Sequence, residues 1–222
     1  MIFLLINILC AVIPALLLVF YFYRRDSQKK EPVSLIWKVF IIGFFSVIPA
    51  VVIELFLEPF AALSNPLQSA FARAFIVAAL VEEGIKLAVI RLFVYERPEF
   101  DEITDGIIYA VTASMGFACF ENILYSTGGL STVLLRAVTA VPLHALASGI
   151  MGYYVGISRF SEKGGLLKGL AIAVLIHGLY DFFLFTGSLL GILVIPLLIV
   201  SWIILKRLLD KALYQDRASG RS

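Results

Sequence analysis

Two adjacent carboxylates and a lysine one helical turn later form the most unusual chemical group in this sequence. Glu82 and Glu83 lie inside an apolar run, and Lys86 follows at a spacing that places its ammonium beside both on a helix. A buried ion pair accounts for the lysine and one glutamate but gives no structural reason for the second carboxylate. Because two carboxylates in a low-dielectric setting do not both ionise easily, one can exchange a proton near neutral pH. The pattern therefore favours general acid–base chemistry.

Further polar residues lie inside apolar runs downstream. Glu121 and Tyr125 are four residues apart, so we expect the tyrosine hydroxyl to hold the carboxylate. His177 and Asp181 have the same spacing, in which the carboxylate can fix the imidazole tautomer. His144 is the other histidine of the chain. The alternative for each is a purely structural role, as a local hydrogen-bonded pair or as a histidine satisfied in the core.

This set of residues suits the activation of water, because no cysteine or serine stands in a nucleophilic setting. One carboxylate would take a proton from water, and a histidine would protonate the leaving amine or stabilise the oxyanion. A second version places a zinc ion on His144, His177 and one or two glutamates, with Glu82 and Glu121 as candidates. The spacing does not match the HExxH motif of zinc proteases. The residues alone leave both versions open.

The elements that carry these residues are apolar stretches long enough to cross a bilayer. Of 222 residues, 61% are hydrophobic and only 15% are charged, which excludes an ordinary soluble domain. The net charge of +2 gives no reason to expect a nucleic-acid partner. We predict one all-α membrane domain over residues 1–222, with a flexible cytoplasmic tail at 209–222. The lipid bilayer surrounds about seven helices, predicted at residues 2–23, 35–57, 69–94, 104–126, 133–157, 166–186 and 189–208.

The basic residues predict how the helices are oriented. Loops that carry Lys and Arg alternate along the chain with loops that carry none, which places the N-terminus outside and the C-terminus in the cytoplasm. On this topology, at ~1.5 Å per residue, the polar groups lie about 8 to 20 Å from the outer ends of their helices. Four helices thus bring polar groups to similar depths. We expect them to meet at one cavity that opens outward.

Three motifs in order resemble a known family. Glu82-Glu83-x-x-Lys86, Phe120-Glu121-x-x-x-Tyr125 and His177-x-x-x-Asp181 are similar to the motif series of the PrsW-type intramembrane proteases. That family belongs with the CAAX prenyl endopeptidases and the bacteriocin-processing membrane proteases. The resemblance covers roughly residues 21–181 and includes Lys30-Glu31-Pro32 and Asp105-Gly106-Ile107-Ile108-Tyr109.

The resemblance implies a multi-pass protease of a prokaryotic cell membrane. Its substrate would be a single-span membrane protein, cut near the outer face in the first cleavage of an anti-sigma factor during stress. Glu82 is implied as the base that activates water, without a metal, and zinc is the alternative. Glu121 stands where CAAX-type enzymes have a histidine, which argues against a prenylated substrate. The implied catalytic residues are Glu82, Glu83, Glu121, His144 and His177, supported by Lys86, Tyr125 and Asp181.

Two other function classes use similar residues. A proton-coupled transporter also carries ionisable side chains in its spans, but the sequence shows no internal repeat and no paired broken helices. A non-catalytic scaffold would keep a degenerate site, whereas the double glutamate and the His–Asp pair are intact here. A prenyl-protein endopeptidase remains the alternative within the protease class.

Overall fold

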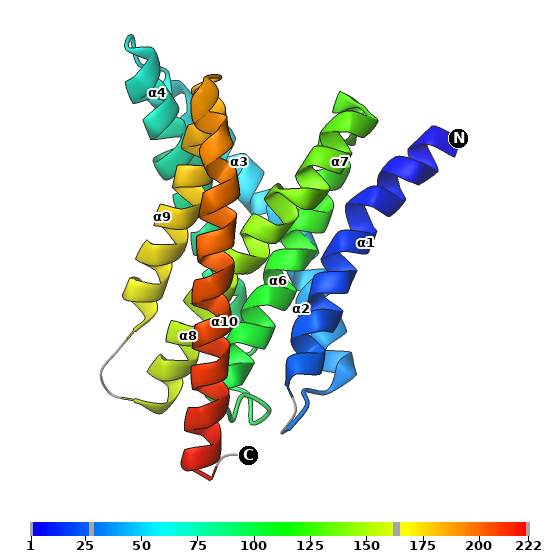
Figure 1. Cartoon of the computed structure of the whole chain (residues 1–222), viewed down its shortest axis with the longest axis vertical. Helices are drawn as coiled ribbons and strands as arrows, with labels where there is room; N and C mark the ends of the chain where they lie inside the picture. The colour runs from blue at the N-terminus through cyan, green and yellow to red at the C-terminus, as the bar shows by residue number, and fades with distance from the viewer. Residues whose placement is uncertain (1, 27–28, 162–164, 221–222) are drawn as a thin grey trace.

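The computed structural model describes residues 2–26, 29–161 and 165–220, which form a bundle of helices running roughly along one axis (Figure 1). Six helical stretches in these ranges are long and apolar enough to cross a membrane, which confirms the predicted all-α membrane fold. A seventh predicted span is helical from Pro66 to Phe93 but carries the charges of the site. The elements are α1 (Ile2–Arg25), α2 (Val33–Phe45), α3 (Val47–Ala61), α4 (Pro66–Ala72), η1 (Arg73–Ala79), α5 (Leu80–Phe93), α6 (Ile103–Leu124), η2 (Tyr125–Gly128), α7 (Leu130–Val138), α8 (Ala140–Phe160), α9 (Leu166–Phe185), η3 (Leu189–Leu193) and α10 (Val194–Ala218).

Prolines explain why two of the predicted spans are each divided into two helices. A proline lacks the amide hydrogen of a helical residue, and its ring crowds the carbonyl four positions earlier. Pro49 stands in this relation to Phe45, where α2 ends. Pro142 stands in the same relation to Val138, where α7 ends. The second break sets the start of α8 and therefore the position of His144.

The central helix α6 is held by close contacts with its neighbours. Every residue of α6 from 103 to 119 is buried. A Cβ added to Gly106 would lie 2.3 Å from the carbonyl oxygen of Gly152 on α8, and one added to Gly116 would lie 2.0 Å from that of Phe40 on α2. Small residues allow helices in membranes to approach this closely. These contacts fix the backbones of α6 and α8, which both carry predicted site residues.

The last helix is longer than its sequence predicts. The last span was predicted at 189–208, but α10 continues to Ala218. Residues 221 and 222 of the predicted flexible tail lie outside the described part of the chain. Asp216 is fully buried, and its carboxylate accepts hydrogen bonds from the backbone amides of Ile103 and Thr104 at 2.8 and 3.0 Å. A carboxylate at a helix N-terminus satisfies amides that have no partner within the helix. Asp216 thus anchors α10 to the start of α6.

A second buried carboxylate joins the connection between α1 and α2 to α6. Glu31 is 3% exposed, accepts a hydrogen bond from the Tyr109 hydroxyl, and faces Asp105. Burial raises the pKa of Glu31 from an ordinary 4.5 to about 7. Between pH 4.5 and pH 7, Glu31 therefore binds more protons in the folded protein than in the unfolded chain. The contribution of Glu31 to stability falls as the pH rises from 4.5 to 7.

We expect Glu31→Gln to weaken the pH dependence of stability. Glutamine keeps an oxygen that can accept the hydrogen bond from the Tyr109 hydroxyl, but its side chain cannot ionise. The variant should therefore melt several degrees above wild type at pH 8 and at nearly the same temperature as wild type at pH 5. Thermal unfolding in detergent at both pH values measures this. Glu96→Gln, at a mostly exposed position, is the control and should follow wild type. Equal pH slopes in Glu31→Gln and wild type would contradict the assignment.

Candidate active site

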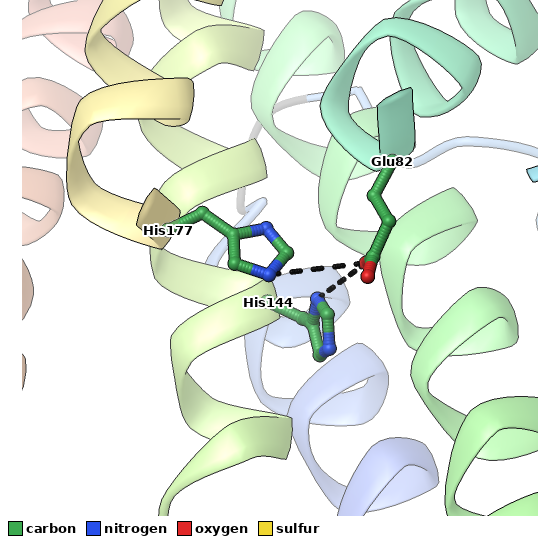
Figure 2. A group of neighbouring side chains, drawn as sticks. All are labelled: Glu82, His144 and His177. Carbon is green, nitrogen blue, oxygen red and sulfur yellow. Dashed lines mark ion pairs between the residues drawn. The ribbon is translucent and has the colours of Figure 1, made fainter. Parts of the chain in front are cut away.

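Three helices that are distant in the sequence place the central side chains of the site opposite one another. Glu82 lies near the start of α5, His144 near the start of α8 and His177 in the second half of α9. Their exposed fractions are 6%, 2% and 2%. Figure 2 shows both imidazole rings close to the Glu82 carboxylate. The fold thus brings together residues that the sequence predicted to converge.

A π-helix directly precedes the double glutamate. η1 (Arg73–Ala79) contains hydrogen bonds that span five residues, such as that from the Leu80 amide to the Phe75 carbonyl. Wide turns of this kind occur frequently at functional sites. The Phe75 ring also packs against Gly178, where an added Cβ would lie 2.3 Å from a ring carbon. Glycine at this position lets α9 approach η1 closely, which brings His177 beside the double glutamate.

Glu82 is the group that the two histidines share. Its Oε2 atom lies 3.8 Å from Nδ1 of His144 and 3.9 Å from Nε2 of His177. One possible ligand atom from each of Glu82, His144 and His177 lies within 4.8 Å of those from the other two residues. Two imidazoles and a carboxylate are a donor set that zinc accepts. We call these three residues the Glu–His–His centre.

A carboxylate holds the far side of each imidazole ring. Nε2 of His144 lies 2.8 Å from Oε2 of Glu121, and Nδ1 of His177 lies 2.9 Å from Oε1 of Glu83. Because an ionised carboxylate can only accept, these ring nitrogens carry protons. Nδ1 of His144 then presents a lone pair to the centre, whereas Nε2 of His177 also faces Asp181 at 3.3 Å and offers a lone pair only when the ring is neutral. Ser148 donates to the second oxygen of Glu83 at 2.7 Å. Metal-binding histidines are commonly oriented by carboxylates in this way.

Lys86 is fully buried and contacts the centre. Its Nζ atom lies 3.1 Å from Glu82 and 2.9 Å from Glu83, as the sequence spacing predicted. It also lies 2.8 Å from Nδ1 of His144 and 4.3 Å from the centroid of the Phe117 ring. The ammonium balances the charge of the double glutamate. Its contact with His144 uses the lone pair that a metal ion would need, so a metal-bound centre requires Lys86 to rest on the two carboxylates.

Asp181 makes the predicted contact with His177, whereas Tyr125 does not make the predicted contact with Glu121. Oδ2 of Asp181 lies 3.3 Å from Nε2 of His177. Tyr125 instead places its ring 4.0 Å from the Arg136 guanidinium, and the predicted hydrogen bond to Glu121 is not among the contacts of the described residues. Arg136 pairs with Glu121 at 2.8 Å in its place. The Tyr125 amide still reaches the Glu121 carbonyl, so the two residues share a helical face, but the Arg136 guanidinium contacts both side chains.

The centre lies in the wall of a cavity of about 1220 Å³. Glu82 lines this cavity, whereas Glu83 is completely buried and reaches His177 instead. Glu83, which was predicted among the catalytic residues, contacts His177 and Lys86 at 2.9 Å each. The cavity reaches the turn between α3 and α4 and the connection between α6 and α7. The predicted site residues that line it are Glu82, Glu121, Tyr125, His144, His177 and Asp181.

Comparison with known proteins decides the class of this site. The sequence matches the family described as PrsW family intramembrane metalloprotease over residues 31–206. This chain belongs to the PrsW family. A protease PrsW from Geobacillus kaustophilus is 39% identical over 78% of this chain and 77% of its own length. Those from Oceanobacillus iheyensis and Clostridioides difficile are 38% and 33% identical, over 87% and 91% of this chain and 89% and 88% of theirs. No solved structure matches the chain.

Membership of the PrsW family confirms the resemblance seen in the motifs. The protein is an intramembrane protease and a multi-pass protein of the bacterial cell membrane. The matched segment contains every predicted site residue. The PrsW chain therefore carries the Glu–His–His centre within the part that it shares with its relatives.

Two cavity residues of this PrsW protease were not predicted as part of the site. Arg136, which lies within the predicted span 133–157, was not singled out, but it lies at the cavity and pairs with Glu121. Glu54 on α3 lines the cavity as well. It is a carboxylate within an apolar run, which is the same signal that singled out Glu82 in the sequence.

Proposed function

We propose that this protease hydrolyses a peptide bond of a single-span membrane protein near the outer membrane face, and that its substrate is of the anti-sigma-factor type. The observation that carries the proposal is the Glu82 carboxylate, which faces two histidines in the wall of a large cavity. A volume of about 1220 Å³ exceeds that of ordinary small-molecule pockets and can admit an extended peptide segment. The motif resemblance supplies the substrate class.

Glu82 is placed to move the proton in the reaction. Lys86 stabilises its charged form from 3.1 Å. As the oxygen of a water molecule attacks the scissile carbonyl carbon, Glu82 accepts a proton from that water. That proton then passes to the amide nitrogen as the carbon–nitrogen bond breaks, and the second water proton follows, so the products are a carboxylate and a protonated amine. Glu83 and Glu121 keep the imidazoles oriented during these steps.

The same centre fits a divalent metal ion such as zinc. The motif resemblance favoured a metal-free reaction, but the donor set supports the alternative, because one possible ligand atom from each of Glu82, His144 and His177 converges on the same point. His144 and His177 would hold the ion together with one oxygen of Glu82, which leaves its other oxygen for proton transfer. When bound, such an ion makes water easier to deprotonate and stabilises negative charge on the carbonyl oxygen.

The charge distribution supports an outward-facing cavity. The last turns of α1 and α8 and the α5–α6 connection meet at one end of the bundle, where Arg25 pairs with Asp210 and Arg159 with Glu96. Basic residues are concentrated at this end, which the positive-inside rule assigns to the cytoplasm. The cavity reaches the α3–α4 turn, which Figure 1 places toward the opposite end. The substrate would therefore be cut on the outer side.

A cleavage assay tests this function. Purified protein in lipid vesicles would receive single-span peptides of the anti-sigma-factor type, and mass spectrometry would identify the cut ends. We expect cuts in the outer half of the span or just outside it. Cuts confined to the cytoplasmic side would contradict the proposed orientation. Proton-driven solute flux in sealed vesicles, without any cut peptide, would contradict the proposed reaction.

A further inference from the structure

Glu54 is a carboxylate in the cavity wall that the proposed reaction does not use. It lies on α3, inside a span whose neighbouring side chains are apolar, and it is half-buried. Together with Val51 and Leu55 it forms the α3 side of the cavity. An ionisable side chain within a membrane span is rare and usually serves function. Because Glu54 lines the cavity, a molecule bound in the cavity can contact its carboxylate.

The other carboxylates that line the cavity have partners within the protein. Glu58, one turn after Glu54, pairs with Arg73 at 2.8 Å. The remaining pairs are Glu82 with Lys86 at 3.1 Å, Glu121 with Arg136 at 2.8 Å, and Asp181 with His177 at 3.3 Å. For Glu54, no ion pair or hydrogen bond of the side chain is found among the described residues.

The surroundings of Glu54 add negative charge instead of balancing it. The carboxylates of Glu82 and Glu121 act on it with the same sign, and Lys86 and His177, which oppose them, are engaged by other acids. A cationic group that entered the cavity beside Glu54 would be attracted by this field. An amide or hydroxyl group would gain less from it.

We propose that Glu54 forms a subsite for a basic side chain, lysine or arginine, of the substrate segment that occupies the cavity. This inference rests on the proposed function, because it names the chemistry of the substrate that the Glu–His–His centre cuts. The long aliphatic stem of a lysine or arginine can pack on Val51 and Leu55 while its charged end reaches the carboxylate. Glu54 thereby selects the register in which the peptide lies across the centre.

Binding to an inactive protein tests the subsite separately from cleavage. Glu82→Gln protein in lipid would receive fluorescent single-span peptides in which one lysine is moved along the outer half of the span. Each would be compared with a peptide that carries norleucine, a neutral residue of similar shape, at the same position. We expect one position at which lysine binds about tenfold more tightly than norleucine.

Charge changes at residue 54 decide whether this preference belongs to Glu54. In the Glu82→Gln background, Glu54→Gln should reduce the tenfold ratio to about one, and Glu54→Lys should favour a glutamate peptide over the lysine peptide. Glu58→Gln is the matched control and should keep the ratio, because Glu58 lies in the same cavity with its own partner. Melting temperatures verify that each variant is folded.

The outcomes separate this inference from the proposed function. The absence of a lysine preference at every position, or its persistence in folded Glu54→Gln, would overturn the subsite, whether or not wild type cuts peptides. A lysine preference that depends on Glu54, in a protein whose wild type cuts none of the peptides, would retain the subsite and contradict the protease substrate class.

Discussion

Replacing Glu82 by glutamine is expected to abolish cleavage, with a loss of about a thousandfold or more in kcat/KM. Glutamine has nearly the same size and keeps an oxygen toward the histidines, but it neither accepts a proton from water nor carries the negative charge that the centre needs. The substitution also removes one donor of the group that could hold a metal ion. Measured cleavage rates on the single-span peptides, with mass spectrometry of the products, give the size of the loss.

The control for this variant is Glu58→Gln. Glu58 lines the same cavity but pairs with Arg73, away from the two histidines, so its loss should change the rate by less than about tenfold. Melting temperatures of both variants must stay near that of wild type. Cleavage by Glu82→Gln at a rate close to wild type would exclude Glu82 as the base and would require another carboxylate of the cavity, such as Asp181, in its place.

The membrane fold could be predicted from the sequence because its signals are local. Apolar length alone placed the helical stretches, and proline positions account for the breaks at Phe45 and Val138. The end of α10 could not be predicted in this way. It depends on Asp216, whose partners on α6 are more than a hundred residues away in the sequence. A contact of that kind follows only from the packing.

The structure brings the predicted site residues together, but some of their contacts differ from the predicted ones. Depth along the helices indicated that Glu82, His144 and His177 would meet, because a charge inside a span must face the bundle interior. Which carboxylate holds which ring could not be predicted. That pairing depends on helix rotation, which the π-helix before the double glutamate alters, and on Arg136, which takes the place at Glu121 assigned to Tyr125.

Zinc binding is expected at one ion per chain in the purified protein, and it should depend on both histidines. His144→Ala and His177→Ala each remove one of three donors, so their zinc content should fall to background. Glu121→Gln keeps the donors but weakens the hold on Nε2 of His144, so zinc affinity should drop about 10- to 100-fold, and excess zinc should restore occupancy. Elemental analysis and competition with a chelating dye measure content and affinity.

The graded response separates a true metal site from chance binding to two nearby histidines. Loss of zinc in both histidine variants, partial loss in Glu121→Gln and full content in Glu58→Gln would match the geometry, in which Glu121 acts only through His144. A chelator should then stop cleavage by wild type, and added zinc should restore it. Metal-free protein that cleaves at the full rate in the presence of chelator would exclude the metal version. Glu82 would then take the proton between two histidines that serve as hydrogen-bonding groups, as the motif resemblance first implied.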